Sequence, residues 1–212
     1  MGLFVKHAVQ FNSGWLAEAS SGILAGMVVA IETNASTGEI QLARADRVAL
    51  NTAFTGPQTI AGIAGDDATS TGNTMVVVDP VYQVVMSKPT RRLGDYKDET
   101  ITNVSNWTDS GIAKRGVTVF SVGGEFATDQ YNTAYSCTAV ATTDTAAAHT
   151  PAINDAYTVG GTTASAETPA VLGKLVYGAI GVLTLPSMWT LARCTGSVSN
   201  GLLPFRWVFV GA

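Results

Sequence analysis

The stretch that decides the predicted fold is GVTVFSVGGEFATDQY, residues 116–131. Its first half alternates between two sets of side chains, as a strand with two different faces does: Val117, Val119 and Ser121 against Thr118, Phe120 and Val122. Gly123 and Gly124 follow, and both can adopt the positive φ that a tight type I′ turn requires. Phe126 and Thr128 then share one face of a second strand. The stretch therefore predicts a β-hairpin without reactive side chains, a scaffold for the segments on either side of it.

The composition favours strands over helices. Charged residues make up only 13% of the 212-residue chain, about half the usual share, and glycine contributes 22 residues. Threonine and valine, which favour strands, are frequent, whereas the lysine, glutamate and leucine of typical helix surfaces are scarce. A surface with so few charges tends to associate, so we expect much of it to be covered by other protein.

Short strand patterns separated by turn residues extend from this hairpin in both directions. They occupy residues 26–32, 39–43, 47–50, 59–64, 74–78, 81–86, 136–141, 157–159, 171–177, 179–185 and 203–210. The turn cluster at residues 34–38 predicts that the first two of these strands pair with each other. Strands at this spacing predict a mainly β fold, a β-barrel or β-sandwich with long loops, in a single β-rich domain of residues 1–212.

Three segments depart from this rhythm. Residues 1–20 form a predicted N-terminal arm, in which residues 3–13 are either a first strand or an extended arm and residues 15–21 a short helical turn. Residues 87–111 are irregular and comparatively charged, and form a predicted long loop suited to reaching a partner. Residues 132–170 are rich in threonine and alanine, and form either a loop that joins weak strands or a small subdomain.

The charge pattern gives no indication of nucleic-acid or membrane binding. The net charge is −4, and the basic residues gather only at residues 88–92 and 114–115, too few to line a nucleic-acid groove. The apolar run at residues 22–31 is too short to span a bilayer, and the start of the chain lacks the pattern of a signal peptide. We therefore expect a protein that is made in a cytoplasm and used without export.

The two cysteines, Cys137 and Cys194, stand far apart and outside any C-x-x-C pattern. Without an export signal, two free buried thiols are the favoured interpretation, and one disulfide is the alternative.

No pattern in the sequence predicts catalysis, a metal or a cofactor. The two histidines, His7 and His149, have no Asp or Glu at ligand spacing, and with two scattered cysteines they make a poor zinc set. Asp66 and Asp67 are interpreted as turn formers whose carboxylates accept loop N–H groups, because the further ligand oxygens of a calcium loop do not follow them. Residues 60–65 lack the pattern of a phosphate-binding loop. We therefore expect no enzyme activity.

Tryptophan placement adds a predicted contact site. Trp189 and Trp207 lie in apolar surroundings and are predicted core residues, whereas Trp107 lies in the polar long loop, where an exposed tryptophan marks a protein contact. With side chains of the arm and the loop it makes up the predicted partner-contact set: Phe4, Lys6, Arg91, Arg92, Tyr96 and Trp107.

Three stretches carry a resemblance to a known family: IAGIAGD at residues 60–66, the block at residues 116–131, and VLGKLVYG at residues 171–178. Together with the short valine-rich strands, they resemble capsid decoration (cement) proteins of tailed double-stranded DNA bacteriophages. The resemblance implies β-barrel or β-sandwich domains on the outer capsid, often dimers or trimers, that bridge neighbouring major capsid subunits. It also implies a virion protein that is made in the host cytoplasm.

A decoration protein needs a rigid β scaffold, low charge and segments that reach its neighbours, which residues 2–11 and 87–111 are expected to supply. Three alternatives stay open. One is another virion component, such as a tail-tube, head-fibre or baseplate protein. The second is an enzyme, such as a small esterase or a polysaccharide depolymerase, and the third is a secreted adhesin, which would require a disulfide between Cys137 and Cys194.

Overall fold

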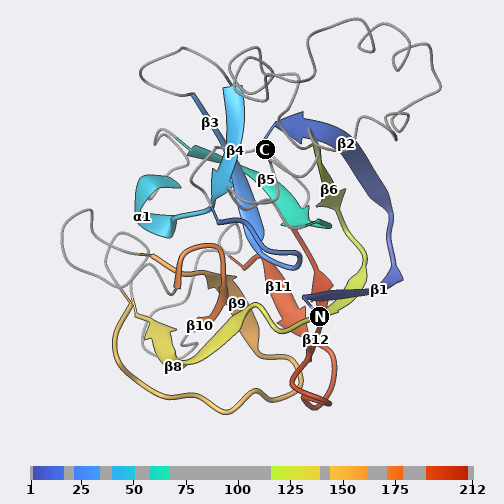
Figure 1. Cartoon of the computed structure of the whole chain (residues 1–212). Helices are drawn as coiled ribbons and strands as arrows, with labels where there is room; N and C mark the ends of the chain where they lie inside the picture. The colour runs from blue at the N-terminus through green and yellow to red at the C-terminus, as the bar shows by residue number, and fades with distance from the viewer. Residues whose placement is uncertain are drawn as a thin grey trace, which may run out of the picture.

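The computed structural model describes residues 2–16, 22–33, 40–50, 58–66, 116–138, 144–161, 171–178 and 190–209. These residues form two β-sheets and one short helix, so the predicted mainly β fold is confirmed. The arrangement is sandwich-like, and neither sheet closes into a barrel within the described ranges (Figure 1). No helix in these ranges is long and apolar enough to cross a membrane.

The first sheet has seven strands, and its neighbouring strands are antiparallel except for the last pair. In spatial order they are β1 (Leu3–His7), β7 (Glu125–Thr128), β12 (Leu203–Trp207), β11 (Ala192–Cys194), β9 (Ala156–Val159), β10 (Leu175–Gly178) and β8 (Tyr131–Cys137). Strands β8 and β9 come from the threonine- and alanine-rich segment, which therefore contributes to this sheet.

The second sheet has five antiparallel strands: β2 (Gln10–Leu16), β6 (Gly116–Val122), β5 (Gln58–Ala64), β3 (Val28–Thr33) and β4 (Ile40–Arg44). The predicted pairing of β3 with β4 is confirmed. Its edge strands β2 and β4 contact each other, although no ladder joins their described residues. The predicted strands at residues 74–78, 81–86 and 179–185 and the long loop at residues 87–111 lie outside the described residues.

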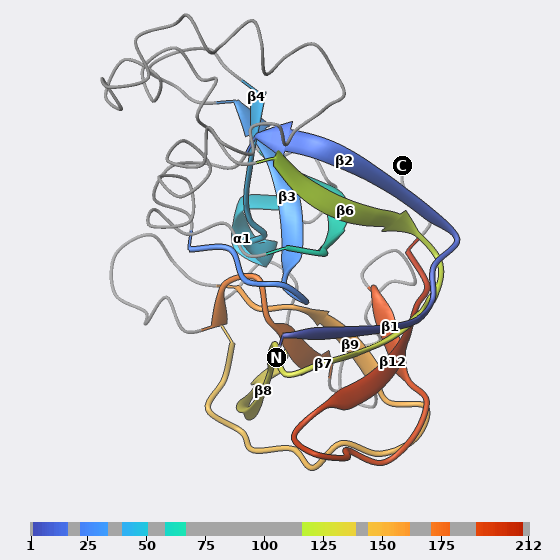
Figure 2. The same ribbon diagram turned by 45° about the vertical axis from the view of Figure 1, so that its right-hand side comes forward.

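The predicted hairpin at residues 116–131 is wrong, because β6 and β7 belong to different sheets. Strand β6 pairs with β2, and β7 pairs with β1. Residues 3–16 and residues 116–128 therefore form one two-stranded ribbon, which bends from one sheet into the other (Figure 2). Gly123 and Gly124 form the corner, with φ of 58° and 110°. A Cβ on Gly124 would lie 2.6 Å from the His7 carbonyl oxygen. The glycines thus serve a corner and not a turn.

The N-terminal segment forms strands, which decides between the two possibilities left open for residues 3–13. Strand β1 is an edge of the first sheet and β2 an edge of the second, so residues 3–16 are not a free arm. The helical turn predicted from residue 15 onward is wrong at its start, because Trp15 and Leu16 belong to β2.

Residues 47–50, predicted as a strand, form helix α1 (Arg47–Leu50) instead. The Asp46 carboxylate accepts the backbone N–H of Val48 at 2.9 Å, and the Leu50 N–H donates to the Asp46 carbonyl, also at 2.9 Å. Asp46 is therefore the N-cap of α1. The predicted strand rested on only four residues, and the capping hydrogen bond favours a helix there instead.

The main core lies between the two sheets. Its side chains come from both layers, including Val28 and Ile63 of the second sheet and Phe126, Leu175 and Trp207 of the first. Trp207 is 1% exposed, which confirms its predicted core position, whereas Trp189 lies outside the described residues. Because this core occupies the inner faces, the surfaces available to a partner are the outer faces, the sheet edges and the loops.

A buried ion pair ties α1 to the chain segment that leads into β9. Arg47 is 0% exposed, and its Nη2 lies 2.8 Å from Oδ1 of Asp144. Its Nη1 donates to the Val159 carbonyl at 2.8 Å, and the other Asp144 oxygen accepts the Gly161 N–H at 2.8 Å. The pair therefore joins parts of the chain that are distant in sequence.

Candidate functional site

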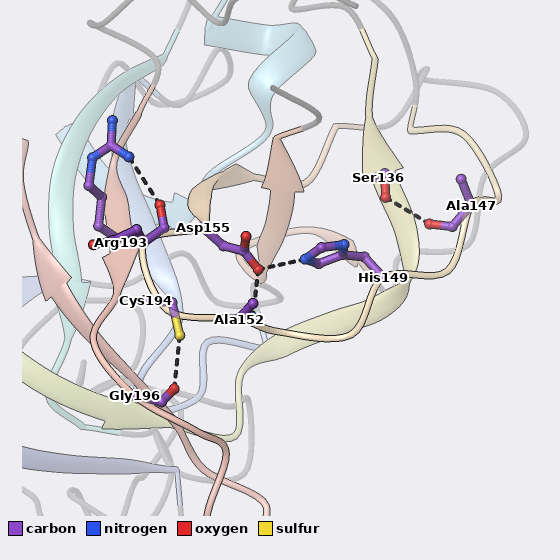
Figure 3. A network of polar contacts seen from close by, with 9 residues as sticks. Ser136, Ala147, His149, Ala152, Asp155, Arg193, Cys194 and Gly196 are labelled. Carbon is purple, nitrogen blue, oxygen red and sulfur yellow. Dashed lines mark hydrogen bonds and ion pairs between the residues drawn. The ribbon is translucent and has the colours of Figure 1, made fainter. Parts of the chain in front are cut away.

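A His–carboxylate pair is the nearest approach to a catalytic arrangement in the described residues. His149 Nε2 lies 2.6 Å from Asp155 Oδ2, which also accepts the Ala152 N–H at 2.6 Å (Figure 3). The His149 ring stacks on Tyr177 with centroids 3.5 Å apart and planes 5° apart. Sequence reasoning found no carboxylate partner for His149, because Asp155 reaches it only through the fold of the intervening loop.

The ring nitrogens of His149 contact no hydroxyl or thiol among the described residues, although the ring borders a surface cleft. The cleft has a volume of about 610 Å³ and is lined by Tyr131, Thr133, Ala148, His149, Thr150, Pro151, Ser197 and Val198. The side-chain hydrogen bond of His149 goes to Asp155, and its backbone N–H donates to Thr133. Nucleophilic catalysis requires a nucleophile within hydrogen-bond reach of its base, and this arrangement does not provide one.

The His149–Asp155 pair lies within residues 144–155, a segment that we name the strap, and its hydrogen bonds hold the end of this segment together. The backbones of Ser136 and Thr145 exchange two hydrogen bonds of 3.0 Å, and the Ser136 hydroxyl donates to the Ala147 carbonyl at 2.7 Å. The His149 N–H donates to the Thr133 carbonyl at 2.8 Å. The strap therefore runs along β8 and covers that edge of the seven-stranded sheet.

The cysteines form no disulfide. Cys137 and Cys194 are both buried thiols, as the favoured sequence interpretation predicted. The Cys194 thiol donates to the Gly196 carbonyl at 3.1 Å, and burial raises the pKa of this thiol. A thiol with a raised pKa is a poor nucleophile and metal ligand at neutral pH. The adhesin alternative required a disulfide that the structure does not contain.

The one described member of the acidic pair has a structural explanation. Asp66 accepts the backbone N–H of Thr118 at 3.0 Å, so its carboxylate does satisfy a backbone donor. That donor belongs to strand β6 and not, as the sequence predicted, to the loop of Asp66, and Asp67 lies outside the described residues. Within the described ranges, no three His, Cys, Asp or Glu side chains gather in a way that could hold a metal ion.

The most distinctive surface feature is a group of exposed apolar side chains on β1, on β2 and between them. Phe4 is 53% exposed, Val5 40%, Val9 62% and Phe11 61%. We call these four residues the edge patch. Phe11 is supported from below by Phe120, with ring centroids 6.2 Å apart. Because successive side chains of a strand project to opposite faces, Phe4 and Val5 lie on the two sides of this ribbon. Several exposed apolar side chains on one short ribbon mark a contact surface more often than a single one does.

The edge patch adjoins a strand edge that no described residue covers. Strand β1 ends the seven-stranded sheet and pairs only with β7 among the described strands, whereas the strap covers the opposite edge at β8. Exposed edges of this kind are templates for pairing with another chain. Lys6 lies at the end of the edge, where the β1–β7 register shifts between Val5 and His7.

The structure describes two of the six predicted contact residues. Phe4 and Lys6 lie side by side on β1 and are both exposed. Arg91, Arg92, Tyr96 and Trp107 lie outside the described residues. The predicted set omitted Val5, Val9 and Phe11. The available signal was the dense, non-alternating placement of apolar residues at positions 3, 4, 5, 9 and 11, which does not fit a strand with one buried face.

Comparisons of this chain with protein-family models, with curated proteins and with solved structures found no match.

Proposed function

We propose that this chain is a virion structural protein, a capsid decoration protein that binds the outer capsid surface and stabilises contacts between major capsid subunits. The observation that carries the proposal is the edge patch: four exposed apolar side chains on a bent ribbon that the core holds in place. The family resemblance of the sequence points to the same class of partner. This function needs surface contacts and requires neither a substrate nor a cofactor.

The ribbon is suited to docking because strand pairing and contact with the core preorganise it. Strand β1 is paired with β7 and β2 with β6, and Gly123 and Gly124 allow the corner between them. The Phe120 ring supports Phe11 and also lies 5.3 Å, centroid to centroid, from the core residue Phe126. A preformed surface loses little conformational entropy on binding, so more of the contact energy appears as affinity.

The affinity of a single site can be modest. Full burial of a Val or Phe side chain contributes about 1.5–3 kcal/mol, and roughly half of each patch residue is still exposed. The four together therefore offer roughly 4 kcal/mol of further apolar burial, of which Val9 and Phe11 supply about half, and backbone and loop contacts add to it. On a capsid the same contact repeats at many equivalent positions, so modest binding at each of them stabilises the whole shell by mass action.

The test is co-sedimentation of the purified full-length chain with capsids that lack it. Val9→Ser and Phe11→Ser are expected to reduce capsid occupancy at least tenfold at subsaturating concentration. Ile153→Ser is the matched control, because Ile153 is as exposed as Val9, at 62%, but lies in the strap. Equal occupancy of all three variants would contradict the assignment. Rings or tubes formed by the chain alone would favour a tail-tube protein instead.

A further inference from the structure

We infer that two copies of this chain pair with each other through the outer edges of their β1 strands, in antiparallel orientation about a two-fold axis at Phe4. This inference does not rest on the proposed capsid function. Its starting point is the outer edge of β1, which no described residue covers. The other edge of the same sheet is occupied by the strap, and the edge strands of the second sheet contact each other.

The backbone alternation of β1 identifies the groups that face outward. The Gly2 carbonyl accepts the Asp129 N–H at 3.3 Å and the Thr128 hydroxyl at 2.8 Å, so the backbone of Gly2 points toward β7. In a regular strand the direction of the backbone N–H and C=O groups alternates from residue to residue. Those of Phe4, which is paired with Ala127, therefore also point toward β7. The N–H and C=O groups of Leu3 and Val5 consequently point away from the sheet.

A second β1 fits this edge in one register. With Phe4 opposite Phe4 of the second copy, Leu3 stands opposite Val5 of the second copy, and each of the two Leu3–Val5 pairs exchanges two backbone hydrogen bonds. The Phe4 pair is then of the non-hydrogen-bonded kind, in which side chains approach most closely. The exposed apolar side chains of β1 thus all gain apolar partners.

Lys6 selects this register and stops the pairing from extending. In this register Lys6 lies opposite Gly2 of the second copy, where the backbone carbonyl of Ala25 occupies the side-chain position of the glycine. Lys6 also lies diagonally beside Phe4 of the second copy, where an ammonium group favours an aromatic face. A register centred on Lys6 would place two ammonium groups opposite each other. The register shift after Val5 ends the regular strand there, so the pair closes as a dimer.

The dimer leaves Val9 and Phe11 free, because they lie beyond the paired residues. Each dimer would therefore present two copies of the corner half of the edge patch. If the proposed capsid function holds, the dimer binds with two linked contacts, which raises its effective affinity without any new interaction.

The test is disulfide trapping in the full-length chain without an N-terminal tag. Phe4→Cys places two thiols at the two-fold axis, at a Cα separation within the range that a disulfide requires. Val9→Cys is the control, exposed at 62% but beyond the paired edge, and the native Cys137 and Cys194 are buried. Under mild oxidation Phe4→Cys is expected to form covalent dimer at least tenfold faster than Val9→Cys. Equal rates would overturn the inference.

Sedimentation equilibrium of the unmodified chain gives an independent reading. A mass twice the chain's 22.0 kDa is expected at high concentration. Val5→Pro removes one outward N–H and leaves the β1–β7 bonds of Phe4 in place, so it is expected to weaken the dimer at least tenfold without loss of the folded state. A monomer at all concentrations, or a dimer that Val5→Pro leaves unchanged, would overturn the inference. Neither outcome bears on the effect of Phe11→Ser on capsid binding.

Discussion

Replacement of the buried Arg47 is expected to destabilise the fold strongly. Its guanidinium is fully buried between the Asp144 carboxylate and the Val159 carbonyl, each 2.8 Å away. Arg47→Met keeps most of the side-chain length but leaves a carboxylate that is 2% exposed without its counter-charge. Breaking one partner of a buried ion pair costs about 3–5 kcal/mol, a large share of the roughly 5–15 kcal/mol that stabilises a typical domain.

The cost of Arg47→Met is also expected to depend on pH. Burial raises the pKa of Asp144, while the charge of Arg47 and its hydrogen bond oppose that increase. In the variant this opposition is gone, so the pKa of Asp144 rises further. A carboxyl group with a raised folded pKa contributes stability below its unfolded pKa, and that stability is lost as pH rises through the folded pKa. The variant should therefore lie closer to the wild type near pH 4 than near pH 7.

Urea unfolding, followed by far-UV circular dichroism at both pH values, measures this cost. Arg193→Met is the matched control, because Arg193 is exposed and its guanidinium donates to the Asn154 carbonyl at 3.1 Å. Its replacement should change the unfolding free energy by no more than about 0.5 kcal/mol. Adding Asp144→Asn to Arg47→Met should recover about 1–2 kcal/mol, because no buried charge then remains. A cost below about 1 kcal/mol for Arg47→Met at pH 7 would refute the reasoning.

Three further expectations concern the corner, the strap and the thiols. Gly124→Ala should lower the unfolding free energy by about 1–3 kcal/mol, because the φ of Gly124 is 110° and a Cβ would meet the His7 carbonyl. Gly196→Ala is the control, since Gly196 has no positive φ and the nearest contact of a Cβ there is 3.5 Å; an equal cost of the two substitutions would contradict the corner geometry at Gly124. His149→Ala should speed proteolytic cleavage within the strap while capsid binding is kept, and unchanged cleavage would contradict the strap's anchoring. Thiol titration should find two reactive groups after denaturation and slow reaction before it; a count of zero would indicate a disulfide.

The elements that were predictable from sequence are those specified by local patterns. The short strand pattern at residues 59–64 predicted β5, and the turn cluster at residues 34–38 predicted that β3 and β4 pair. In each case the pattern of side chains within the strand, or the turn between two strands, carries the information.

The corner at Gly123 and Gly124 was not predictable in the same way. Two glycines with positive φ satisfy a hairpin and a corner equally well. What decides between them is that β6 pairs with β2 while β7 pairs with β1, and these partners lie more than a hundred residues away in the sequence. Local chemistry therefore located the change of direction but did not specify its geometry.

The candidate site depends on strand order, which local patterns do not contain. Phe4 and Val5 lie at an edge because β1 is the last described strand of its sheet; in a central strand, neighbouring strands would cover both of their flanks. The pairing of His149 with Asp155 depends in the same way on the path of the strap. Asp46 is different, since an N-cap residue before residues 47–50 was visible in the sequence and outweighs a four-residue strand pattern.

The central claim is that the edge patch binds the outer surface of a capsid, and imaging of purified virions tests it most directly. The account predicts this chain at repeated, equivalent positions on the outer capsid, with Val9 and Phe11 of the edge patch against major capsid subunits. A chain found only in the tail or baseplate, or one on the capsid with these two side chains facing solvent, would contradict it.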